Sequence, residues 1–468
     1  MPQVRAMRLI SAIEAGRTPA TQLQSLIDGD AGRLGELRAL LKLRGQCDRI
    51  KVNPAVVAVL FGTPATLAAL QAVDTAQTRI YTPAFGEAST MAAVAASPQA
   101  MASLADNASA VSALVASSVA MTQASASSVA VAALSDHLNA NNQVLAGSFK
   151  VGAYLDKIAV DAGAASSATL AALNTLGSVN ASSSAMASVA ASAPAMNAIA
   201  RSANARAVIG SSGNGYDAIK VSPMAIGKLV AGFAGLDPTD FAHMDAVAAS
   251  AVARAAIGTS GAAYDAIKLS DLAMAKYIAG SAGLAPASVA SLSALMASAS
   301  AMQVVADSTP ALAALVGSSL AIAAAVASTP AMAALVATVK GRMALYQSDA
   351  LLAALAGSAT AMAAARAATA YTVLAWAEKG QTPEPLSLPG TAYVVLGASR
   401  SVVNTRTVTL ETLRAGSTQS ATTPTIGTIA NTSATEVNTA IPIAATFTAR
   451  LSGTGSGTGY LGLLRCDA

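Results

Sequence analysis

Aromatic and charged residues are scarce in this sequence, and their scarcity limits the kind of core it can form. The chain has 468 residues, of which 54% are hydrophobic, yet only 3% are aromatic and 11% are charged. The apolar content is therefore mostly alanine, which buries little area per residue. Typical enzyme domains fill their cores with Phe, Leu, Ile and Trp. The composition argues against such a core and favours thin helices that approach one another closely.

Cysteine and histidine are almost absent as well. Cys47 and Cys466 are far apart and have no metal-ligand spacing, and His137 and His243 belong to no triad or metal pattern. We therefore expect no catalytic residue, no metal site and no cofactor, and we do not expect an enzyme. The first residues lack the continuous apolar segment of a signal peptide, which indicates synthesis in the cytoplasm without oxidative folding.

Positive charge is concentrated in residues 1–52, which carry nine basic and five acidic side chains. This difference of +4 equals the net charge of the whole chain, so the rest is neutral. The neutrality of the residues after 52 argues against an extended nucleic-acid-binding surface. The same 52 residues predict three short helices, the last starting at Asp30 and ending at Gly45. We interpret them as a small helical head.

Residues 53–380 repeat with a period of ten. The segments SPQAMASLAD, STPALAALVG and STPAMAALVA share one frame, in which Ala is followed by a larger apolar residue and, three positions later, by a second. Ser or Thr before Pro is a typical helix start, with a hydroxyl N-cap and Pro in the first turn. Proline inside a continuous helix would cost about 3 kcal/mol, so recurring prolines predict many short helices. Each ten-residue repeat should form one helix of a solenoid-like shaft, and we expect two repeats per coil.

A membrane span is the alternative interpretation of the uncharged stretches, since 308–339 exceeds twenty residues. Against it, Ser, Thr and Pro return every ten residues, and no aromatic belts or basic flanks are present. We therefore expect no membrane contact.

A longer duplication lies inside the array. Residues 205–250 and 253–298 are offset by 48, and 25 of the 46 aligned positions are identical. Tyr216 and Asp217 recur as Tyr264 and Asp265. This pair is either a ligand contact present twice or, as we favour, a tyrosine that packs inside and an aspartate that faces water.

The C-terminal part has a different composition and a different pattern of polarity. Residues 381–389 form a proline-rich joint, and residues 390–468 alternate in polarity and are rich in Thr and Val. We predict an antiparallel β-sandwich. The glycine string at 452–459 superficially matches a phosphate loop, but it precedes a strand rather than a helix, so we interpret it as a hairpin tip.

The ten-residue repeats SPQAMASLAD, STPALAALVG and STPAMAALVA resemble alanine-rich repeats in structural proteins of tailed bacteriophages, which occur in fibre, whisker and neck-associated proteins. A helical head, a repetitive shaft and a C-terminal β domain are similar to that plan. The resemblance implies a virion component made in the bacterial host cytoplasm. It implies a homo-oligomer, in fibres usually a trimer, with the head docked on other virion proteins and residues 390–468 distal. The array lacks the heptads of many fibre shafts, which leaves fibre, neck and capsid decoration open.

Two other classes compete with this interpretation. A bacterial surface adhesin would need a secretion signal or an anchor. An ice-binding protein would need Thr at a strict phase, whereas the polar positions of the repeat mix Ser, Thr, Asn and Gly. We expect a fibre or fibre-like appendage whose β domain binds a host-surface glycan or another virion protein.

Overall fold

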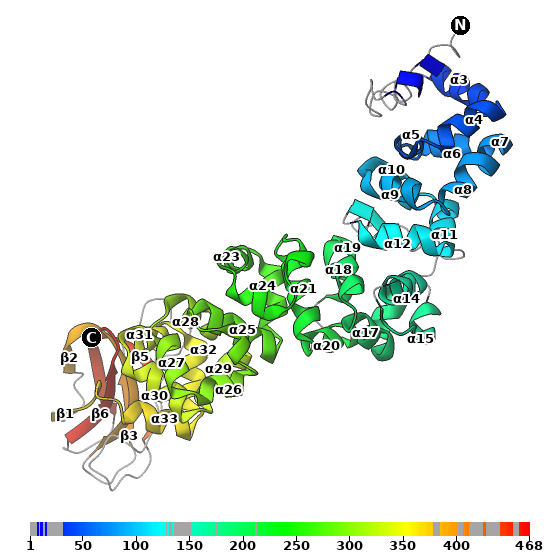
Figure 1. Ribbon diagram of the computed structural model, residues 1–468. Helices are drawn as coiled ribbons and strands as arrows, with labels where there is room; N and C mark the ends of the chain where they lie inside the picture. The colour runs from blue at the N-terminus through cyan, green and yellow to red at the C-terminus, as the bar shows by residue number, and fades with distance from the viewer. Residues whose placement is uncertain are drawn as a thin grey trace. The chain divides into compact units, whose positions relative to one another are not determined.

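The computed structural model describes most of residues 31–134 and 151–377 and parts of the C-terminal region (Figure 1). Short gaps fall at 128, 131–132, 162, 174–175 and 211–212. Before residue 31 only residues 7–8, 10–12 and 15 are described. Beyond 377 the described ranges are 384–400, 406–410, 425–426, 440–452 and 458–468. The first two predicted head helices and His137 therefore lie largely or wholly outside the described residues.

The described part of the head differs from the prediction at Gly45. Helix α3 (Ala31–Leu41) ends early, and a second helix, α4 (Arg44–Lys51), continues through the glycine. The prediction of one helix ending at Gly45 is wrong, because α4 buries Cys47 and Ile50 and this burial outweighs the low helix propensity of glycine.

Short helices follow in unbroken order up to residue 126. The repeats at Pro54 and Pro64 form α5 (Pro54–Leu60) and α6 (Pro64–Ala72), with Asn53 and Thr63 as N-caps. The next elements are α7 (Asp74–Ala76), the π-helix η1 (Gln77–Tyr81), α8 (Thr82–Ala84), α9 (Ala88–Ala96), α10 (Pro98–Ala105), α11 (Ala108–Ala116) and α12 (Ser118–Ala126).

The array continues from residue 151 to residue 366. Its first half contains α14 (Val151–Asp161), α15 (Ala168–Ala171), α16 (Leu176–Ala181), α17 (Ser183–Ala190), α18 (Ala193–Arg201), α19 (Ala203–Ile209), α20 (Asn214–Lys220), α21 (Pro223–Phe233), η2 (Pro238–Asp240) and α22 (Met244–Ala249). Its second half contains α23 (Ala251–Thr259), α24 (Gly261–Lys268), α25 (Asp271–Ser281), η3 (Pro286–Ser288), α26 (Leu292–Ala297), α27 (Ala299–Ala306), α28 (Thr309–Val316), α29 (Ser319–Val326), α30 (Thr329–Ala337), α31 (Val339–Gln347), α32 (Asp349–Ala356) and α33 (Ala359–Arg366).

Each uncharged repeat is one helix with a hydroxyl cap, as predicted. Ser308, Ser318 and Ser328 are the N-caps of α28, α29 and α30, and each accepts a hydrogen bond from the backbone N–H three residues on. The alanine that donates this N–H is fully buried in all three helices, and the larger apolar residue that follows it (Leu312, Ile322 or Met332) is at most 5% exposed. Alanine fits this position because neighbouring helices come close to it.

Three helices, not two, make one turn of the array. Helix α18 packs on α21, α25 on α28, α27 on α30 and α30 on α33, so each helix lies on the third one before it. Consecutive helices meet at steep angles, 101° between α27 and α28 and 97° between α29 and α30. The expectation of two repeats per coil is wrong, because two such bends do not bring the chain back over itself.

The N-cap hydroxyls also join successive turns. While accepting from its own helix, such a hydroxyl donates to a backbone carbonyl 32 residues earlier, at the end of a helix one turn before. Among the described residues, six pairs have this separation: Ser117–Phe85, Ser127–Ala95, Ser222–Ala190, Ser328–Met296, Thr338–Ala306 and Ser358–Val326. One side chain thus satisfies a free N–H at one helix start and a free C=O at another helix end.

Removing such a hydroxyl should cost more than removing a simple cap. Ser328→Ala is expected to lower the free energy of unfolding by about 2 kcal/mol, because it loses the cap and the donor to Met296 O, 2.6 Å away. Ser291→Ala is the control, since Ser291 caps α26 and its hydroxyl otherwise contacts exposed Ser293; it should cost about 1 kcal/mol. Urea unfolding measures both, and equal losses would contradict a link between turns.

Both duplicated segments have a glycine at a close contact between two helices. In the first copy Gly232 on α21 lies so close to α18 that an added Cβ would be 2.1 Å from Ala200 O. In the second copy Gly280 on α25 has the same relation to Ala248 O, also at 2.1 Å. Each copy also buries a lysine, Lys228 or Lys276. Glycine permits the close contact between the two helices in each copy.

In the described residues no single helix is long and apolar enough to cross a membrane. Three pairs of consecutive helices are together long and apolar enough for a membrane span, but each pair is bent by 97° or more at the break between its helices. The stretch 319–337 is one of them.

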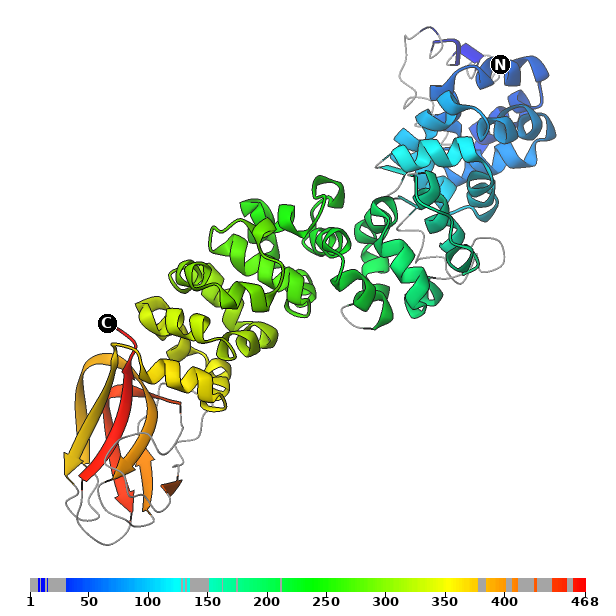
Figure 2. The same cartoon turned by 60° about the horizontal axis from the view of Figure 1, so that its bottom comes forward.

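The C-terminal strands form one antiparallel sheet (Figure 2). Its strands are β1 (Tyr371–Ala377), β2 (Glu384–Arg400), β3 (Arg406–Leu410), β4 (Thr425–Ile426), β5 (Ile441–Ser452) and β6 (Thr458–Arg465), in the order β1-β6-β2-β5-β3-β4. The described strands therefore form one sheet, not the two of the predicted sandwich. Helices α31 and α33 pack against β2, and α33 also packs against β6. A sheet needs another layer to bury its apolar face, and these helices provide one.

The boundaries of the sheet also differ from the expected ones. Strand β1 begins at Tyr371, upstream of residue 380, and residues 384–389 of the predicted joint belong to β2. The prediction of a hairpin tip at the glycine string is wrong. The strands before and after the string, β5 and β6, are not neighbours in the sheet, because β2 lies between them. Residues 453–457 of that string lie outside the described residues.

Candidate functional site

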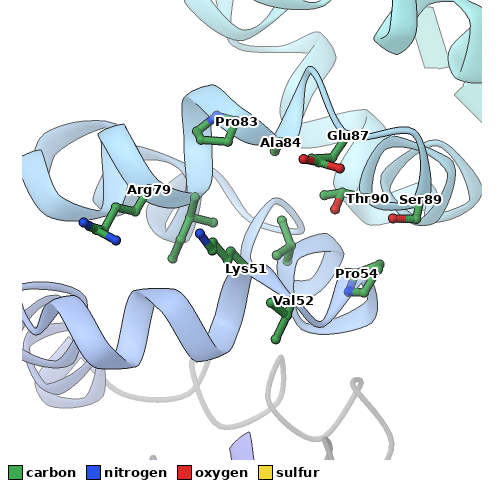
Figure 3. Close-up of a pocket in the computed structure, with 11 residues that line it drawn as sticks. Lys51, Val52, Pro54, Arg79, Pro83, Ala84, Glu87, Ser89 and Thr90 are labelled. Carbon is green, nitrogen blue, oxygen red and sulfur yellow. The ribbon is translucent and has the colours of Figure 1, made fainter.

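A cavity of about 360 Å³ lies among the N-terminal helices, between the start of α5 and the segment from η1 to α9 (Figure 3). Its walls include Val57, Ile80 and Ala84, and Val52 at its rim is 72% exposed. The remaining lining residues are Lys51, Pro54, Arg79, Pro83, Glu87, Ser89 and Thr90. An apolar floor with a charged rim can accept a side chain or a loop of another protein.

The cationic side of this cavity is partly neutralised by Asp48. Arg79 donates to Asp48 at 2.5 Å, and Lys51 Nζ lies 3.7 Å from the same carboxylate. The hydrogen bond from Arg79 lowers the pKa of Asp48. Glu87 lies on the opposite side. The cavity therefore presents both signs of charge and has no arrangement of nucleophile and base.

The duplicated Tyr-Asp pairs have the arrangement of a packed helix. Tyr216 is 2% exposed, and burial raises the pKa of its hydroxyl group. Asp217 and Lys220 form an exposed ion pair of 2.6 Å on the same helix, and the second copy repeats this pair. Tyr264 donates to Ala314 O at 3.1 Å. The tyrosines thus fill space between helices and the aspartates face water.

The other sequence candidates do not come together. Cys47 and Cys466 are buried and free, and burial raises the pKa of both thiols, that of Cys466 to about 12. His243 is exposed. Among the described residues, no group of three His, Cys, Asp or Glu side chains could hold a metal ion.

Two arginines, which sequence reasoning missed, join the sheet to the helices. Arg342 on α31 is 4% exposed and donates to Val336 O at 2.9 Å and to Ala468 O. Arg366 at the end of α33 donates to Leu396 O in β2, at 2.7 Å. Burial lowers the pKa of both guanidinium groups. The sequence does contain a signal for Arg342, because its segment KGRMALYQ introduces charge into an otherwise apolar series of repeats.

Asp467, which follows β6, should make the stability of the C-terminal sheet depend on pH. Its carboxylate accepts from Arg465 Nε at 2.9 Å and from Thr391 Oγ1 at 3.0 Å. Burial alone would raise the pKa of Asp467, but these hydrogen bonds outweigh it and bring the pKa to about 2.

A carboxyl group with a depressed pKa stabilises the fold above its unfolded pKa, and this contribution is lost as the pH falls through the folded value. The difference in unfolding free energy between the unaltered protein and Asp467→Asn should therefore be full above about pH 4 and shrink towards about pH 2. Urea unfolding at several pH values measures it. A difference that does not change with pH would contradict this role of Asp467.

A second, more open depression of about 810 Å³ lies over α27 and the starts of α28 and α31. Val304 and Pro310 line it, and Asp307 and Lys340 form an exposed ion pair of 3.2 Å beside them. It contains no aromatic side chain, which sugar sites commonly use for stacking.

No protein-family model matches this sequence, and no curated protein matches it either.

Proposed function

We propose that this protein is a structural component of a bacteriophage virion, a fibre or fibre-like appendage. Its repeat array spaces a C-terminal β domain that binds a host surface or another virion protein. The observation that supports this most directly is the repeated bond between turns, in which the N-cap hydroxyls of several helices donate to a carbonyl 32 residues earlier. Such a device can be repeated to any length, as a spacer requires.

The ends of the chain support two attachment roles. The N-terminal helices carry the net positive charge of the sequence and a cavity with exposed Val52 at its rim, which suits docking on other virion proteins. The C-terminal sheet is held to the last helices by Arg366, which donates to β2, and by the buried Arg342, which donates to Ala468 after β6; this suits a domain that transmits a binding event to the shaft. Neither role needs a cofactor or a catalytic residue.

Immunogold electron microscopy tests the assignment. Antibodies against this chain should label phage particles produced by cells that express it, on an appendage of the tail. Label at the neck or on the capsid would instead support a decoration protein of the virion. Label confined to the bacterial envelope would support the adhesin, and soluble protein with no particle label would overturn the proposal.

The docking role of the N-terminal cavity has its own test. Val52→Asp should reduce incorporation of the full chain into particles at least tenfold, because it places a charge on the exposed apolar rim. Val252→Asp is the matched control, since Val252 is equally exposed at 72% but lies far along the chain. Equal incorporation of both variants would contradict docking through this cavity.

A further inference from the structure

Within its described residues, the edge strand β1 carries none of the usual sequence features that protect against pairing. It lies at one end of the sheet and, among the described strands, pairs with β6 alone. Its seven residues, YTVLAWA, contain no charge and no proline, and its register with β6 runs without a bulge. Proteins usually protect edge strands with lysine, proline, bulges or short length.

The free backbone groups of β1 can be assigned from its register. Arg465 N–H donates to Ala370 O at 3.0 Å, which makes these residues a hydrogen-bonded pair. Hydrogen-bonded pairs alternate along an antiparallel ladder, so Thr372 and Leu374 bond to β6. The N–H and C=O groups of the intervening residues Val373 and Ala375 then point away from β6. Both residues are exposed, Val373 to 48%.

We infer that β1 pairs with β1 of a second copy of this chain, antiparallel, about a two-fold axis at Leu374. This register sets Val373 opposite Ala375 of the second copy, so the outward N–H and C=O groups of each chain meet those of the other. Leu374 meets itself in the non-hydrogen-bonded position between them. The pairing is isologous, the commonest kind in homo-oligomers.

Charge favours a second copy over a charged peptide as the occupant. The strand carries no charge for such a peptide to recognise. Counted along the sequence in the self-pairing register, the next residues, Glu378 and Lys379, correspond to Ala370 and Thr369 of the second copy, so no like charges oppose each other.

This inference does not depend on the proposed function. A two-fold pairing gives a dimer, whereas the resemblance to phage fibres implies a trimer, so the two ideas can fail separately.

Analytical ultracentrifugation of the full chain tests the pairing. The unaltered protein should sediment with twice the chain mass of 45.9 kDa, and Ala375→Pro with the mass of one chain. Proline removes the outward N–H of residue 375 and leaves the hydrogen bonds to β6 intact. Ala359→Pro is the matched control, because residue 359 is the first residue of α33, where proline is tolerated. This control should remain a dimer.

Disulfide cross-linking gives an independent readout of the register. Non-hydrogen-bonded pairs have Cα atoms about 4.5 Å apart, within the range of a disulfide. Leu374→Cys should therefore form a covalent dimer on mild oxidation. Thr372→Cys should not, because residue 376 lies opposite it, and the native Cys47 and Cys466 are buried. A monomeric or trimeric unaltered protein, a dimer that survives Ala375→Pro, or equal cross-linking of the two cysteine variants would overturn the inference.

Discussion

Gly280→Ala is expected to lower the free energy of unfolding by about 2–3 kcal/mol, although alanine is the better helix former. An added Cβ would lie 2.1 Å from Ala248 O and 2.8 Å from Ala248 C. Both atoms belong to the backbone at the end of α22, so no side-chain rotation can relieve the clash. Helix α25 would have to move away from α22 and give up part of its buried contact.

A nearby glycine provides the control with the opposite sign. Gly258 on α23 has nothing within 4 Å of its added Cβ, so Gly258→Ala should stabilise the protein by roughly 0.5 kcal/mol. Urea unfolding followed by circular dichroism measures both variants of the full chain. Gly232→Ala in the first copy should behave like Gly280→Ala. A neutral or stabilising effect at Gly280 would show that α22 and α25 are not in such close contact.

Asp245→Ala is expected to cost about 3–5 kcal/mol, because it leaves the buried Lys276 without its counter-charge. The Lys276 side chain is 7% exposed and forms an ion pair with Asp245. In the part of the chain that the structure describes, Lys276 Nζ also donates to Pro286 O, at 3.2 Å. A lone carbonyl compensates poorly for a desolvated ammonium group.

Two variants make this expectation specific. Asp265→Ala removes an exposed partner of Lys268 in the same region and should cost at most about 1 kcal/mol. The double variant Asp245→Ala with Lys276→Met should recover most of the loss, because it leaves no charge buried. Thermal and urea unfolding measure all three. If the double variant is as unstable as Asp245→Ala, the loss comes from packing and not from the charge.

The first copy of the duplication balances its buried lysine differently. Asn197, just upstream of the duplicated range 205–250, is offset by 48 from Asp245, and Lys228 instead donates to Pro238 O at 3.1 Å and Phe241 O at 3.3 Å. Burial lowers the pKa of Lys228, and the positive charge of Arg201 lowers it further. The lysine was thus retained in both copies while its surroundings diverged. Sequence alignment shows the repeated lysine, but only the packing shows that it is buried.

Helix starts are the part of this protein that sequence predicts best. A hydroxyl N-cap followed by proline or alanine sets local hydrogen bonds, and these need no partner from elsewhere in the chain. Ser308, Ser318 and Ser328 are N-caps as expected. Gly45 shows the limit of such local rules, because buried neighbours override its tendency to end a helix. The arginines that hold the sheet were missed for a related reason, since their acceptors are carbonyls distant in sequence.

The sequence by itself determined that the chain is a series of short, capped helices followed by strands, because period, caps and strand composition act over a few residues. The tertiary structure decided that three helices make a turn, since this depends on bends near 100° and on hydroxyl bonds that span 32 residues. It also decided that the described strands form one sheet packed against α31 and α33. Both outcomes depend on which distant surfaces bury each other, and a local pattern does not carry that information.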